Sequence, residues 1–310
     1  MVNSIFLVRL LLLLVLFGFI WMMRPKSSLH RVLLFPLTRE KRTVVIIVAV
    51  VTILTAILPM RVNPVWNQEG WGHHVQYQKM AQSIIDGHLY LDYGDPDPVL
   101  VNMENPYDPN ARQAMGAQFE WDHAWYNNHY YMYFGIVPVI LLFVPLKIIG
   151  ITITECHATQ FFALFFVIGI FALFAEISKK FCKDISLTGY LTLSVAASYM
   201  NVWYAVKYPS LYCTAITSGM CMAIWGFYLM FRVFVAGNVK REKWYIFMGA
   251  LFSALIFGCR PTIGFVTLTY IPMILYFKKK ESVQTKTDSF CKHHKNDCVI
   301  FHPLPIHSKL

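Results

Sequence analysis

A succession of long apolar runs dominates this chain and constrains its fold more than any other feature. A helix needs about 20 consecutive apolar residues to cross a bilayer, and about eight runs approach that length. Charged residues make up only 14% of the chain, against about 25% in soluble domains. The expected spans are Ile5–Met23, Thr43–Met60, Tyr131–Gly150, Ala158–Ala175, Ile185–Val206, Leu211–Val235, Trp244–Cys259 and Thr262–Phe277. We therefore expect an all-α, polytopic membrane protein with about eight transmembrane helices.

One long polar and aromatic loop interrupts these runs and is the place where water-soluble chemistry can occur. It carries nine carboxylates but only three strong bases, Arg61, Lys79 and Arg112. The sequence thus predicts four regions. They are two N-terminal helices with a basic connector (1–60), the large extracytoplasmic loop (61–130), a helical bundle (131–277) and a polar, disordered tail (278–310).

The basic residues predict which side of the membrane each end faces. The connector Arg24–Arg42 holds six Lys and Arg residues against one acid, so the positive-inside rule places it in the cytoplasm and the acidic loop outside. With eight full crossings, Lys179–Lys183 and Lys240–Lys243 would lie outside, against the rule. The alternative is that Tyr131–Gly150, which contains two prolines, does not fully cross. The net charge of +10 does not indicate nucleic-acid binding, because the bases flank apolar runs.

An amphipathic helix is expected over Val75–Asp86, in the first half of the loop. Its apolar residues recur at helical spacing, and Gly87 supplies a stop signal. The apolar residues are Tyr77, Met80, Ala81, Ile84 and Ile85. Such a stripe fits either the membrane interface or the core of the loop itself, and the sequence leaves both open.

Two aspartates after this helix form a weak candidate cation site. Pro96 and Pro98 favour extended backbone at Asp95 and Asp97, and residues two apart in an extended segment share a face. A divalent cation, Mg²⁺ or Mn²⁺, could bridge the two carboxylates. A solvated Asp-Pro turn explains the same residues.

Half of the residues from Phe119 to Phe134 are aromatic, and they adjoin a predicted membrane entry where Trp and Tyr are common. Asn127 and Asn128 tolerate the positive φ angles of a tight turn, so the flanking residues are expected to pair as a hairpin. An aromatic belt does not explain Asp122 and His123, which lie among the rings.

Partial burial among aromatic rings would suit Asp122 to general-base work near neutrality, whereas a structural hydrogen bond is the alternative. Aromatic faces beside a carboxylate are a common way to hold a sugar ring. We therefore regard the neighbouring rings as candidate substrate contacts: Trp121, His123, Trp125 and Tyr126. Arg260 lies between two apolar runs, where its guanidinium would bind a lipid phosphate or reach toward the membrane surface.

Several motifs resemble those of the C-type (GT-C) membrane glycosyltransferases, and most closely bacterial multi-span proteins described as glycosyltransferase-like. The resemblance covers Asn63–Phe277. The motifs are DGHLYLD (Asp86–Asp92), NPYDP (Asn105–Pro109), the segment Trp121–Pro145 and CRP (Cys259–Pro261). It implies an integral, multi-pass protein of the plasma membrane that transfers a sugar from a polyprenyl-phosphate donor to an acceptor outside the cytoplasm. It also implies a carboxylate in the first outer loop that acts as a base or binds a divalent cation, and basic groups that hold the donor phosphate.

The chain departs from the family pattern at two points. The family carries an acidic pair just after the span, whereas Glu69 stands alone here, so Glu69 and Asp122 are both candidates for the base. The family also has more spans, so a truncated and inactive fragment is one alternative expectation. A transporter or flippase of lipid-linked glycans is the other.

Overall fold

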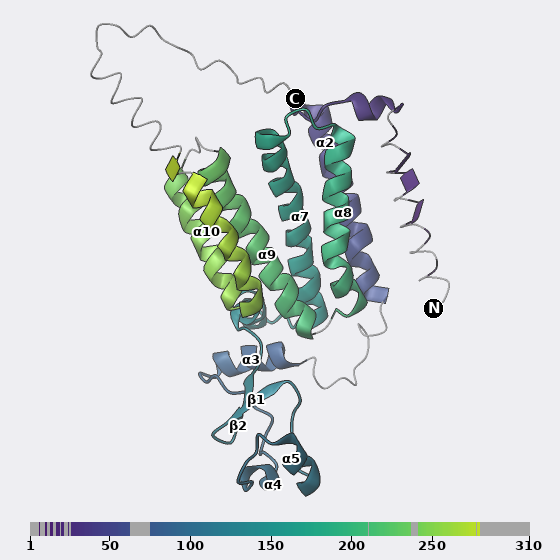
Figure 1. The fold of residues 1–310 in the computed structure, drawn as a ribbon. Coiled ribbons are helices and arrows are strands. Elements are labelled where there is room, and N and C mark those ends of the chain that lie inside the picture. Colours follow the sequence, from purple (N-terminus) through teal and green to yellow (C-terminus); the bar gives the residue numbers. More distant parts are fainter. Residues whose placement is uncertain are drawn as a thin grey trace, which may run out of the picture.

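Figure 1 shows a computed structural model, which describes residues 26–62, 75–209, 211–236, 241–276 and 278–279, together with scattered positions among residues 6–24. Long helices run side by side in a bundle, and a smaller domain built from the polar loop extends from one end of it. The bundle helices are α2 (Arg39–Ile57), α7 (Glu155–Phe181), α8 (Leu187–Lys207), α9 (Leu211–Phe231) and α10 (Glu242–Phe257), followed by a 3₁₀ helix (Pro261–Thr269).

Three helical stretches are long and apolar enough to cross a membrane: Arg39–Arg61, Glu155–Phe181 and Leu211–Val235. The described residues therefore contain fewer candidate spans than the eight expected. Helices form at the other predicted runs of the bundle, but α10 has only 16 residues. The expected first span, Ile5–Met23, lies largely outside the described residues.

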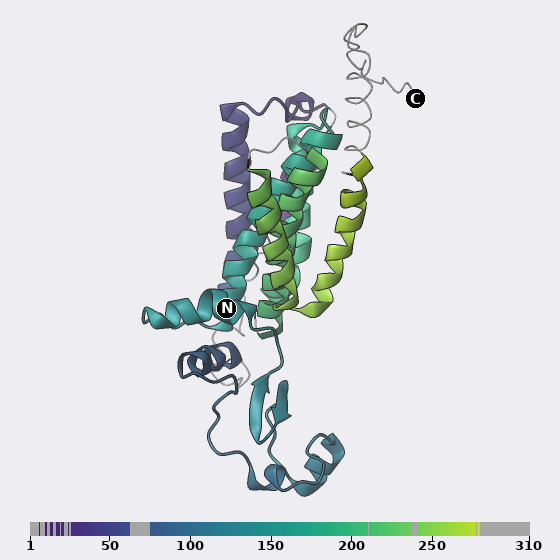
Figure 2. The same cartoon turned by 90° about the vertical axis from the view of Figure 1, so that its left-hand side faces the viewer.

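The expectation of a span at Tyr131–Gly150 is wrong. The segment begins in a strand, and its helix covers only Val139–Ile148, which at 1.5 Å per residue is about half the thickness of a bilayer core. Pro138 precedes the first helical turn, and Gly150, at φ 81°, ends the helix in a left-handed conformation. Hydropathy alone therefore overstated the length of this helix, which lies across the end of the bundle (Figure 2).

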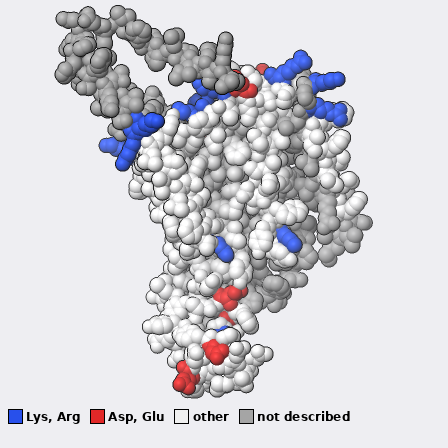
Figure 3. Space-filling model, in the orientation of Figure 1, with Lys and Arg blue, Asp and Glu red and all other residues white. Residues whose placement is uncertain are grey.

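Because this short helix does not run the length of the bundle, the basic segments gather at one end of the bundle. The connector pairs with the turn between α7 and α8: the N–H of Leu34 donates to the carbonyl of Ile185 (2.9 Å), and that of Leu187 donates to Val32 (2.7 Å). This places the connector beside the lysines that end α7. Lys and Arg gather at this end in Figure 3, whereas Asp and Glu lie mainly at the other, over the loop domain.

The loop domain consists of short elements. They are α3 (Gln76–Ile85), α4 (Pro98–Val101), α5 (Pro109–Met115), β1 (His123–Tyr126) and β2 (His129–Met132). The predicted hairpin is confirmed: β1 pairs antiparallel with β2, and Asn127 and Asn128 have φ angles of 47° and 60°. These angles match the two-residue turn that follows the natural twist of paired strands.

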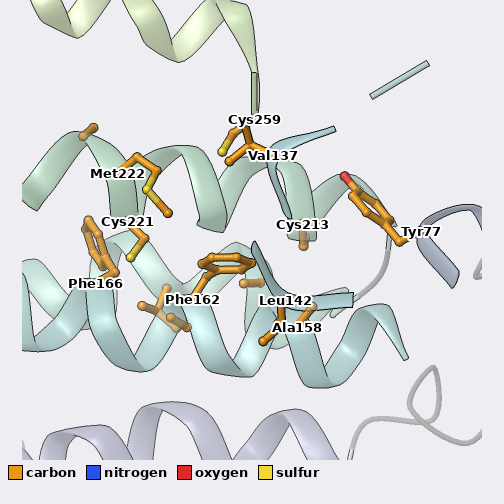
Figure 4. Close-up of a cluster of buried hydrophobic side chains, with 14 of the residues drawn as sticks. Tyr77, Val137, Leu142, Ala158, Phe162, Phe166, Cys213, Cys221, Met222 and Cys259 are labelled. Carbon is orange, nitrogen blue, oxygen red and sulfur yellow. The ribbon is translucent and has the colours of Figure 1, made fainter. Parts of the chain in front are cut away.

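Helix α3 confirms the predicted amphipathic stripe and decides where it packs. Tyr77, Met80 and Ala81 are buried, and the Tyr77 ring stacks on Phe143 with 5.4 Å between centroids. These three residues of the stripe thus face the protein, against the helix Val139–Ile148, whereas Ile85 at its end is exposed. Figure 4 shows Tyr77 joining the apolar cluster that extends into the bundle around Phe162, so α3 couples the loop domain to the helical bundle.

Candidate functional site

Two of the motifs named above, Trp121–Pro145 and Cys259–Pro261, lie next to each other where the hairpin returns to the bundle. The backbone N–H of Val137 donates to the carbonyl of Gly258 (2.9 Å), which directly precedes the Cys259–Pro261 motif. A Cβ on Gly135 would lie 2.0 Å from the carbonyl oxygen of Gly258, so only glycine allows this approach. We call this region the junction: the hairpin exit, the α3 helix, the starts of α7 and α9, and Cys259–Pro261.

Asp122 and Arg260 both act electrostatically on Tyr212 within the junction. Asp122 lies just before β1 and has a φ of 61°, a conformation that Asp and Asn tolerate better than most residues. Tyr212 is at the start of α9, and its hydroxyl interacts electrostatically with both the Asp122 carboxylate and the Arg260 guanidinium. The charges of a carboxylate and a guanidinium from distant parts of the sequence therefore both act on this phenol at the end of the bundle.

Hydrogen bonds on both sides hold the backbone of Asp122 in position. Its carbonyl accepts from the side-chain amide of Gln76 (2.8 Å). The next residue, His123, is buried, with Nδ1 2.6 Å from the carbonyl of Trp121 and Nε2 2.7 Å from the hydroxyl of Tyr93. Nδ1 therefore donates and Nε2 accepts. Burial raises the pKa of Tyr93, and the charges of Glu120 and Glu155 add to the shift, which keeps its hydroxyl a donor.

The aromatic rings predicted to hold a sugar divide into two groups. Side chains alternate between the two faces of a strand, and β1 buries His123 and Trp125. Trp125 is 6% exposed and packs on Tyr130, whereas Trp121 and Tyr126 are 69% and 68% exposed. The ring of Trp125 therefore supports the hairpin, and the two exposed rings are free to meet a ligand.

Asp97 has a structural role that explains its position. Its Oδ1 accepts from the N–H of Val99 (2.9 Å) and its Oδ2 from that of Gln118 (2.6 Å), so both oxygens cap backbone groups. Among the described residues no group of three or more His, Cys, Asp or Glu side chains is arranged to hold a metal. A cation bound by Asp95 and Asp97 stays a prediction, as does any role for Glu69, which lies outside the described residues.

A buried carboxylate that the sequence analysis missed completes the junction. Glu155, the first residue of α7, is 0% exposed, and its Oε1 accepts from the backbone N–H of Tyr77 (3.3 Å). Its Oε2, the Tyr77 hydroxyl and Nη1 of Arg260 are buried without a hydrogen-bond partner among the described residues. The signal in the sequence was a single acid at the start of a long apolar run, which resembles an ordinary helix N-terminus.

The comparisons with known proteins found no relative of this chain. No family model matches the chain, and neither the curated proteins nor the solved structures contain a match.

Proposed function

We propose that this protein is a membrane glycosyltransferase of GT-C type, which transfers a sugar from a polyprenyl-phosphate-linked donor to an acceptor outside the cytoplasm. The observation that carries the proposal is the hydrogen bond from Val137 to Gly258, which joins the hairpin that follows Asp122 to the motif that contains Arg260. The charges of both residues act on the Tyr212 hydroxyl. This arrangement combines a base with a phosphate-binding cation. It lies where an apolar bundle meets a polar domain, which is where a lipid-linked phosphate would be presented.

The proposed reaction assigns one task to each group. Asp122 accepts the proton of an acceptor hydroxyl while that oxygen attacks the anomeric carbon of the donor sugar. The bond between this carbon and the phosphate oxygen breaks, and polyprenyl phosphate leaves with the bonding electron pair. Arg260 binds the phosphate oxygens as negative charge grows on them. Trp121 and Tyr126, both exposed, offer rings on which the acceptor or the sugar stacks.

The proposed orientation puts the loop domain outside the plasma membrane and the basic end in the cytoplasm, as the charge distribution favours. Helix α3 and the helix Val139–Ile148 then lie at the level of the lipid headgroups. Ile148 and Ile149 are both exposed, as expected for side chains that face lipid.

Cysteine labelling in intact cells tests this orientation. With Cys291 and Cys298 replaced by serine, an Asn110→Cys variant is expected to react with a membrane-impermeant maleimide. The exposed native Cys182, at the basic end, is the internal control and is expected to react only after the cells are permeabilised. Protection of Asn110→Cys in intact cells would remove the basis for sugar transfer outside the cytoplasm.

The function itself is tested by incubating purified protein with radiolabelled polyprenyl-phosphate sugars. Consumption of the donor with release of polyprenyl phosphate is the expected result. Movement of unchanged donor across liposome membranes would identify a flippase instead. If the protein neither consumes nor moves the donor, it is a non-catalytic membrane protein. Repeating the assay after treatment with EDTA tests whether a divalent cation, Mg²⁺ or Mn²⁺, takes part.

Replacing Arg260 by glutamine is expected to lower the rate of donor consumption about 10- to 100-fold, because hydrogen bonds to charged groups contribute about 1.5–3 kcal/mol. The matched control is Lys243→Gln, which removes a cation from the first turn of α10, at the opposite end of that helix. Equal activity in the two variants would contradict the role assigned to Arg260.

A further inference from the structure

Buried polar atoms without partners are concentrated at the junction. Proteins pair nearly all of their buried polar groups, so each exception needs a reason. In the described part of the chain five buried side-chain polar atoms lack a hydrogen-bond partner, and one of them is on Thr192 in α8. The other four come from the junction: Gln76 Oε1, Tyr77 hydroxyl, Glu155 Oε2 and Arg260 Nη1.

Tyr77 connects the charged members of this group. Its backbone N–H is bound by Glu155, and its hydroxyl points from α3 toward the bundle (Figure 4). Burial raises the pKa of Tyr77 well above its ordinary value. The charges of Glu155 and Cys259 add to the shift, and that of Arg260 opposes it. Glu155 thus contacts the Tyr77 backbone, and the charges of Glu155, from α7, and of Arg260, which follows α10, both act on the Tyr77 hydroxyl.

The Glu155 carboxyl and the Arg260 guanidinium do not pair with each other directly. A salt bridge joins Arg232 to Glu176, but none joins Glu155 to Arg260 in the described part of the chain. Arg260 thus keeps an unused donor, Glu155 an unused acceptor, and the Tyr77 hydroxyl can act as either. A buried set of this kind is costly unless another molecule supplies the missing partners.

A sugar phosphate supplies the complementary set. Its phosphate oxygens accept from Arg260, and a sugar hydroxyl donates to Glu155. A phosphate without a sugar satisfies the guanidinium but offers no comparable hydroxyl to the carboxylate.

We propose that Glu155, Tyr77 and Arg260 form a closed subsite that holds the sugar-phosphate group of the donor, with Arg260 on the phosphate and Glu155 on a sugar hydroxyl. This inference rests on the proposed function and assigns the donor head group to the inner side of the junction. Tyr77 and Glu155 are both 0% exposed, so α3 covers the subsite and must shift along its contact with Phe143 to admit the donor.

The test compares farnesyl phosphate with a panel of its glucosyl, mannosyl, galactosyl and arabinosyl derivatives, titrated calorimetrically into the detergent-solubilised full chain. At least one glycosylated form is expected to bind about tenfold more tightly than farnesyl phosphate, which corresponds to about 1.4 kcal/mol. Glu155→Gln and Tyr77→Phe are each expected to abolish this preference while leaving the affinity for farnesyl phosphate within about twofold. The matched controls, Glu104→Gln and Tyr107→Phe, alter exposed loop residues and are expected to keep the preference.

The unfolding temperature without ligand gives an independent readout. Tyr77→Phe removes a buried hydroxyl that has no partner but keeps the stacked ring, so the unfolding temperature is expected to stay the same or rise. A clear fall would mean that the hydroxyl is already satisfied, for example by buried water, and would overturn the proposal. So would an absence of sugar preference in the unaltered protein, or its survival in both variants. If the subsite fails while the protein still consumes donor, only this inference is lost, whereas absence of donor consumption refutes the proposed function.

Discussion

Replacing Asp122 by asparagine is expected to lower the rate of sugar transfer about a thousandfold, since a positioned general base contributes about 10²–10⁴-fold. The change is clean because asparagine has nearly the same shape and also tolerates the left-handed conformation at this position, where φ is 61°. The hydrogen bond that the Asp122 carbonyl accepts from Gln76 involves only the backbone and is retained. Release of polyprenyl phosphate from labelled donor, at saturating acceptor, measures the effect.

Two further variants decide how this result is interpreted. Asp86→Asn makes the same chemical change at the exposed end of α3 and is expected to leave the rate unaltered. Glu69→Gln tests the second candidate for the base. If Glu69→Gln abolishes transfer and Asp122→Asn does not, the proton acceptor is Glu69, and Asp122 serves to position Tyr212.

Replacing Gly135 by alanine is expected to destabilise the protein by at least about 3 kcal/mol, beyond the usual range for overpacking, because backbone atoms cannot move aside easily. The added Cβ would lie 2.0 Å from the carbonyl oxygen of Gly258 and 2.7 Å from that of Cys259. Relief of these clashes requires the hairpin exit to move away from the CRP motif, which breaks the hydrogen bond from Val137 to Gly258. Asp122 and Arg260 would then separate, so sugar transfer is expected to be lost as well.

Thermal unfolding in detergent, followed with a dye that fluoresces on reaction with buried thiols such as Cys259, measures this loss. The control is Gly94→Ala. Gly94 has a φ of 81°, and a Cβ added there would meet open space, so alanine bears only the left-handed conformational cost of about 1–2 kcal/mol. If both variants unfold at the same temperature, the close approach at the junction does not limit stability.

Local patterns in the sequence were sufficient for the elements that local forces determine. The apolar spacing of α3 and its glycine stop predicted a helix that the structure contains. The Asn127-Asn128 pair predicted the hairpin turn. Asp108, which directly precedes Pro109, caps α5 by accepting from the N–H of Asn110 (2.9 Å), as expected for an Asp-Pro pair at a helix start. In each case the determining residues lie within a few positions of one another.

The remainder depended on contacts between distant segments. Counting apolar residues predicted a full span at Tyr131–Gly150, although the helix there is short and lies against α3. Glu155 could not be recognised from its neighbours, because its burial results from Tyr77, 78 positions earlier in the chain. The same holds for the convergence of Asp122 and Arg260 on Tyr212, which no spacing along the sequence reveals.

The pairing of the connector with the α7–α8 turn has a mechanical consequence. At the basic end, the segments that precede α2 and α8 are joined by the backbone bridge between Leu33 and Ser186. Farther along, the hydroxyls of Thr55 and Tyr199 hydrogen-bond to each other. These two contacts hold helices α2 and α8 together at two points along their length. We therefore expect that a long prenyl tail does not enter the bundle between α2 and α8, and that it enters between other helices.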